Sequence, residues 1–172
     1  MGTRCYLKSA SEEQLSILRG EPNLIYAFFG DEAEEGDPPV PEGFLEQTGG
    51  METDLDKTWH GLHFLFTGTD EEGDLPAAFL FKGGTELEPF GARAVSFPDA
   101  RQYKEFLYSL SEDELRSRFD PDRMTELDLY PDHIWKRNPA DTLSYLLEYF
   151  EVLRTFTRDV VAEGLGLVIW IV

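Results

Sequence analysis

The stretch LDKTWHGLHFLFTG, residues 55–68, decides the fold of this chain. Its apolar residues recur at helical spacing, at Leu55, Trp59, Leu62 and Phe66. Residues three and four apart share one face of a helix, and such a stripe is typical of a face turned toward a core. The pattern therefore predicts an amphipathic helix over residues 55–67 that points Trp59 and His63 inward, side by side.

Capping residues mark where the helices begin and end. Thr53 or Asp54 is a suitable N-cap for the 55–67 helix, and Gly68 follows where a left-handed residue ends a helix. Further caps open two more helices, since Ser11 with Gln14 and Ser111 with Glu114 each form a capping box. The longest helix is predicted over residues 141–163, with Gly164 at its end.

Strands are predicted at both ends of the sequence. Residues 3–9 alternate between two faces, which is typical of a strand with one buried side. The final GLVIWIV, residues 166–172, is apolar throughout and therefore predicts a central strand covered on both faces. Together these elements favour the α+β class: one domain over residues 1–172, with a small mixed β-sheet that includes both terminal strands and is packed by several helices.

The charge balance limits the partners of this chain. It has 34 Asp and Glu against 15 Lys and Arg, a formal net charge of −19. Such a surface repels phosphate backbones and anionic lipid head groups, so neither nucleic acid nor a membrane is an expected partner. A basic protein is the partner that this charge would attract.

The acidity is concentrated before the 55–67 helix. No Lys or Arg occurs from Gly20 to Asp56, and Pro38, Pro39 and Pro41 interrupt the middle of the stretch. Residues 30–52 are therefore predicted to form a long, solvated surface loop. It either keeps the protein soluble or binds a basic partner, and the candidate partner-binding residues are Asp31, Glu32, Glu34, Glu35 and Asp37.

Motifs of catalysis are missing from the sequence. Neither a phosphate-binding glycine loop nor a GxSxG elbow occurs, and Cys5, the one cysteine, cannot form an intramolecular disulfide. His60 and His63 lie three apart, but a catalytic zinc needs a third ligand, so no metal or cofactor is predicted and His60 is expected in solvent. With no signal peptide and no apolar run near 20 residues, the expected location is the cytoplasm.

Three blocks of the sequence match a known family in order and spacing. They are residues 55–68, DRMTELDLYPDHIW at 122–135, and the long helix with its closing apolar strand. The sharpest matches are Leu55, Lys57, Trp59, Leu62, His63, Gly68, Phe119, Met124, Tyr130, Pro131 and Trp135. In these residues the chain resembles the YfbM-like family, a group of domains of unknown function. The resemblance implies a small, single-domain, bacterial-type cytoplasmic protein, and it names no catalytic residue.

Two functional hypotheses follow. The first is a non-enzymatic protein of inhibitor or immunity type that binds a basic protein partner through the acidic segment. The alternative is a small-molecule or metal-binding enzyme with a pocket between the 55–67 helix and the 130–135 loop. Its candidate ligand-binding residues are Lys57, Trp59, His63, Arg93, Tyr130 and Trp135. The missing catalytic motifs favour the first.

Overall fold

The structure, a computed structural model, describes residues 2–46 and 50–172 and is built on one five-stranded sheet. The strand order is β2-β1-β5-β4-β3. The strands are β1 (Cys5–Ala10), β2 (Glu52–Asp54), β3 (Thr85–Leu87), β4 (Ala92–Val95) and β5 (Gly166–Ile171). The α+β class is confirmed, and the strand that closes the chain is central as predicted. The sheet is antiparallel throughout rather than mixed, because each neighbouring pair of strands runs in opposite directions.

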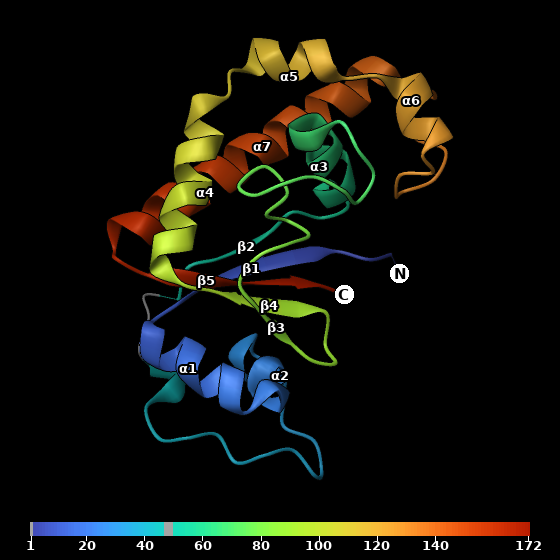
Figure 1. Cartoon of the computed structure of the whole chain (residues 1–172). Helices are drawn as coiled ribbons and strands as arrows, with labels where there is room; N and C mark the ends of the chain where they lie inside the picture. The colour runs from blue at the N-terminus through green and yellow to red at the C-terminus, as the bar shows by residue number, and fades with distance from the viewer. Residues whose placement is uncertain (1, 47–49) are drawn as a thin grey trace.

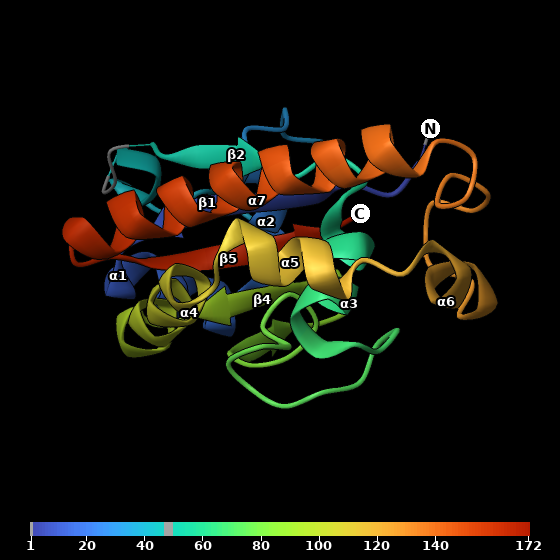
Figure 2. The ribbon, with the colours of Figure 1, turned by 90° about the horizontal axis from the view of Figure 1, so that it is seen from above.

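Helices cover both faces of the sheet. They are α1 (Glu12–Gly20), α2 (Ile25–Phe28), α3 (Trp59–Thr67), α4 (Phe97–Ser109), α5 (Glu112–Arg118), α6 (Pro121–Glu126) and α7 (Pro139–Ala162), with short 3₁₀ turns at Pro22–Leu24 and Phe44–Glu46. Figure 1 shows α1 and α2 below the sheet and α3, α4, α5 and α7 above it. Seen from above, α7 runs along the sheet beside α4 and α5 (Figure 2). Among the described residues, no helix combines the length and apolarity needed to cross a membrane.

Two hydrophobic cores result, one on each face. Along β5, Leu167 and Ile169 belong to the larger core under α4 and α7, while Val168 and Trp170 belong to the smaller core with α1 and α2. This alternation explains why the strand is apolar at every position. Both predicted capping boxes form, at Ser11 before α1 and at Ser111 before α5.

The 55–67 helix begins later than predicted. Thr53 and Asp54 belong to β2 and pair with β1, so neither can cap a helix. The chain turns after Leu55, and α3 starts at Trp59 with no side-chain hydrogen bond at its N-cap. Its end is as predicted, because Gly68 has φ 74°. The helix is not amphipathic, since every residue from Trp59 to Phe66 is buried.

The acidic segment is shorter as a loop than predicted. Residues 31–43 have neither helix nor strand, but Phe44 is fully buried against Phe28, and β2 already begins at Glu52. The Gln14 side chain donates a 2.6 Å hydrogen bond to the Phe44 carbonyl, which fastens the end of the loop to α1. Positions 47–49 of the predicted 30–52 loop lie outside the described residues.

Candidate functional site

Trp59 is the centre of an aromatic cluster at the start of α3. Its ring stacks on His60, with centroids 5.1 Å apart, and on Tyr130 at 5.4 Å. Its indole N–H donates to the carbonyl of Thr3 at 3.2 Å. The side chain therefore joins α3 to the 130–135 loop and to the first residues of the chain.

His60 was expected in solvent, and this prediction is wrong. The residue is 7% exposed because both ring nitrogens bond to distant backbone. Nδ1 accepts the N–H of Tyr130 at 2.9 Å, so Nε2 carries the proton and donates to the carbonyl of Asp70 at 3.0 Å. Burial lowers the pKa of this imidazole below its ordinary value. His60 is thus a neutral link between two loops.

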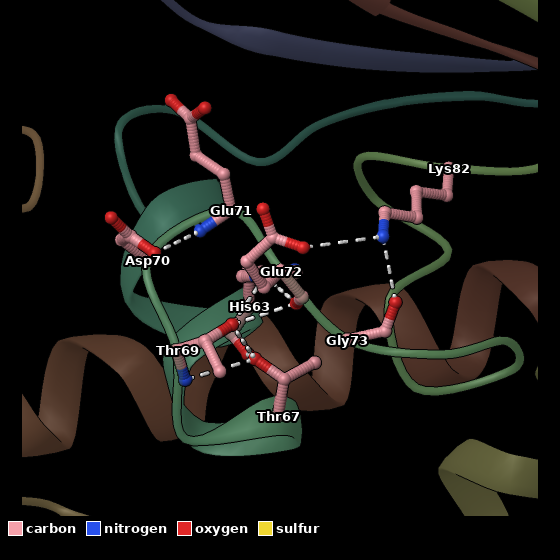
Figure 3. A network of polar contacts seen from close by, with 8 residues as sticks. All are labelled: His63, Thr67, Thr69, Asp70, Glu71, Glu72, Gly73 and Lys82. Atoms are coloured by element: carbon pink, nitrogen blue, oxygen red, sulfur yellow. Dashed lines mark hydrogen bonds and ion pairs between the residues drawn. The ribbon is translucent and has the colours of Figure 1, made fainter.

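His63 lies one helical turn further along, and it points inward as expected. The residue is fully buried, and its ring meets Phe81 edge-on at 4.3 Å between centroids. Nε2–H donates to the carbonyl of Glu72 at 3.0 Å (Figure 3). Nδ1 is buried with no hydrogen-bond partner. Burial lowers the pKa of His63 to about 4, so this imidazole is also neutral.

Arg93 is a buried cation that holds backbone. Its guanidinium donates to the carbonyls of Phe79 at 2.9 Å, Leu80 at 2.6 Å and Gly83 at 3.1 Å, and also to that of Lys82. No ion pair joins it to a carboxylate among residues 2–46 and 50–172. Burial lowers its pKa, although an arginine remains charged. The residue fixes the turns between α3 and β3.

The remaining candidate residues, Lys57, Tyr130 and Trp135, pack closely against glycines. Lys57 and the hydroxyl of Tyr130 lie against Gly2, where an added Cβ would be 2.9 Å from Lys57 Cε. Trp135 is 1% exposed and donates to the carbonyl of Leu129 at 2.9 Å, while its ring packs so closely on Gly61 that an added Cβ would lie 2.7 Å away. These contacts fill the space between α3 and the 130–135 loop.

The six predicted ligand-binding residues are not gathered in any one of five hollows on the described surface. One of these five is lined by Arg93, one by Trp135 and one by Lys57, and none by two of the six. Trp59, His63 and Tyr130 line none of these hollows. Among the described residues, no three His, Cys, Asp or Glu side chains are placed to hold a metal ion.

The acidic loop, in contrast, encloses an open hollow of about 500 Å³. We call it the acidic hollow, and its lining is Tyr26, Asp31, Glu32, Glu34 and Asp37. Glu35 is exposed beside it without lining it. A hydrogen bond of 2.6 Å from the Glu34 N–H to Asp37 Oδ2 folds the loop back on itself. Four of the five predicted partner-binding residues are thus brought together.

Tyr26 is the lining residue that the sequence reasoning missed. It comes from α2 and is 41% exposed, and its ring meets Phe90 and Trp170 edge-on at 5.5 and 5.6 Å. The one available signal was its place in an apolar stretch directly before the acidic run. An exposed aromatic ring beside carboxylates attracts cations through both charge and the ring face.

These features describe a small α+β protein with one antiparallel sheet between two helical layers, a buried histidine pair on α3, and an acidic surface hollow. The family described as a domain of unknown function, DUF1877, matches residues 1–170, and the chain belongs to that family. No curated protein matches it.

A solved structure shares the fold. It is the crystal structure of a protein of unknown function, YfbM from Escherichia coli. The two sequences are 22% identical, and the two structures superpose with a TM-score of 0.75. The match covers 98% of this chain and 99% of that chain. The YfbM-like resemblance is therefore confirmed, and it extends over almost the whole length of both chains.

Proposed function

We propose that this protein is a non-enzymatic binding protein that acts in the cytoplasm and holds a basic segment of a protein partner in the acidic hollow. The observation that carries the proposal is the lining of this hollow by four carboxylates and one exposed tyrosine, with no basic side chain. An inhibitor or immunity type of complex, in which an acidic protein neutralises a basic one, fits this arrangement.

The anchoring of the loop supports a binding role. Phe44 and Phe28 are fully buried at its two ends, with ring centroids 5.9 Å apart. The carboxylates therefore extend from fixed ends, so that less conformational entropy is lost on binding than with a free tail. The net charge of −19 adds long-range attraction for a cationic partner and raises the rate of encounter.

A peptide of alternating arginine and glycine, labelled with a fluorophore, is the probe that tests this proposal. We expect anisotropy to show binding at about 20 mM salt and at least tenfold weaker binding at about 200 mM, because salt screens exposed charges. Neutralising the hollow with D31N, E32Q, E34Q and D37N removes four charges. At about 0.5 kcal/mol each, the loss of binding is roughly 2 kcal/mol, or about thirtyfold.

A matched variant separates this hollow from net charge alone. E105Q, D113N, E148Q and E163Q also remove four exposed carboxylates, but from α4, α5, α7 and the residue after α7, on the other face of the sheet. We expect this control to weaken binding by less than about threefold. Equal losses in the two variants, or no binding of the peptide to the unaltered chain at low salt, would contradict the proposal.

A further inference from the structure

Residues 69–74 form a strap over α3, directly after Gly68. Their sequence, TDEEGD, contains no large apolar side chain, so the strap contributes none to either core. Glu71, Glu72 and Asp74 are exposed, and the carboxylate of Glu71 points away from the network in Figure 3. Polar contacts must therefore hold the strap down.

Two of those contacts come from the histidine pair beneath it. His60 donates to the carbonyl of Asp70 and His63 to that of Glu72, each at 3.0 Å. The Thr69 hydroxyl donates to the same Glu72 carbonyl at 2.7 Å. From the other side, Lys82 donates to the carbonyl of Gly73 at 2.9 Å, with its ammonium 3.8 Å from the Glu72 carboxylate. Figure 3 shows His63, Thr69 and Lys82 converging on the strap.

We propose that the strap is an acid-released cover, which opens when His60 and His63 take up protons and thereby uncovers the aromatic cluster of both rings with Phe81. In the closed state neither ring has a place for a second proton. Nδ1 of His63 is enclosed with no acceptor, and Nδ1 of His60 faces the N–H of Tyr130. A proton on either nitrogen would leave a buried charge without an acceptor or set two donors face to face.

The charges around the pair have opposing effects. Asp70 and Glu71 favour a proton on His60. A proton on His63 is favoured by the charge of Asp70 and opposed by those of Lys82 and His60. Desolvation outweighs all of them and lowers both pKa values. In the open strap the rings reach water and regain their ordinary pKa, so acid shifts the balance toward the open state.

The size of the effect follows from His63 alone. Its pKa is about 4 when closed and 6.5 as an ordinary imidazole. The open fraction therefore rises roughly thirtyfold between about pH 7.5 and pH 5 by proton linkage. Protonation of His60 adds to this increase.

Cleavage after Glu71 and Glu72 by a glutamyl endoprotease measures the opening. Each rate is divided by that of an unfolded peptide of the same sequence at the same pH, which removes the pH dependence of the protease. We expect the normalised rate to rise by at least about tenfold from pH 7.5 to pH 5 in the unaltered chain. Sites in α7, at Glu148 and Glu151, should remain uncut over the same range.

Variants assign the effect to the histidines. His63→Gln keeps an N–H donor for the Glu72 carbonyl but cannot titrate, so its rise should fall below that of the unaltered chain, to the part that His60 alone contributes. His133→Asn, at the third and exposed histidine, should keep the full rise. Thr69→Val removes the hydroxyl that donates to the Glu72 carbonyl, so it should speed cleavage already at pH 7.5. If His63→Gln does not fold, this variant still tests whether polar contacts hold the strap closed.

Three results would overturn the proposal: an unchanged rate at pH 5, a full rise in folded His63→Gln, or equally fast cleavage of α7, which would mean global unfolding. None of these measurements involves the acidic hollow. Failure of the strap and failure of the partner-binding proposal are therefore independent.

Discussion

The strap (residues 69–74) and the acidic loop (residues 31–43) have similar compositions but differ in how they are held to the rest of the protein. Both are rich in carboxylates and lie on the surface without helix or strand. The strap is bound from below by two histidines and from the side by Lys82, whereas no cation pairs with residues 31–37 among the described residues. An acidic composition therefore does not decide a role. What packs beneath the chain decides whether an acidic segment is held down or left unpaired.

Replacing Arg93 by Met should have the largest effect, because it breaks the support behind the strap. The guanidinium donates to four carbonyls in residues 79–83, and Met would leave those of Phe79 and Leu80 buried without this donor. We expect the free energy of unfolding in urea to fall by about 4 kcal/mol. Arg101→Met is the control, since Arg101 is exposed on α4 and should cost less than about 0.5 kcal/mol. If Arg93→Met lowers the free energy of unfolding no more than Arg101→Met does, Arg93 is not needed to hold the turns of residues 79–83.

Lowering the pH should reduce the free energy of unfolding through His63, which lies beneath the strap. Near pH 7 both the folded and unfolded states hold a neutral imidazole, so the residue adds no pH dependence there. As the pH falls below 6.5 the unfolded chain takes up a proton, while the folded chain does not until about pH 4. The free energy of unfolding therefore falls in this window, by up to about 3 kcal/mol.

Urea unfolding at several pH values, in the unaltered chain and in His63→Gln, isolates this contribution. The difference between the two chains should grow steadily from pH 6.5 to pH 4, since they differ only at residue 63. Parallel curves over that range would show that His63 does not remain neutral in the fold.

Local patterns predicted most of the fold, and long-range contacts account for the errors. Gly68, the capping boxes and the closing strand were predictable because each is determined by neighbours a few residues away. The start of α3 was not, because strand pairing with Tyr6 and Leu7 takes Thr53 and Asp54 away from the helix. A pattern of spacing cannot show that competition.

The candidate site divides in the same way. The acidic loop was visible as a run of charge, and the run itself places four of its carboxylates around one hollow. His60 was misplaced because its partner, the N–H of Tyr130, lies 70 residues further along the chain. Arg93 was predicted as a ligand-binding residue, and nothing in its strand indicates that carbonyls of residues 79–83 would surround it.

Neutralising the acidic hollow should have the smallest effect on stability. The substitutions D31N, E32Q, E34Q and D37N leave the core untouched, and the amide that D37N introduces keeps an oxygen that accepts the N–H of residue 34. Relief of repulsion among four neighbouring carboxylates should raise the free energy of unfolding slightly, by less than about 0.5 kcal/mol. Urea unfolding at low salt measures the change, and added salt should remove it because the charges are exposed. A loss above about 1 kcal/mol would mean that these carboxylates support the fold instead of being free for a partner.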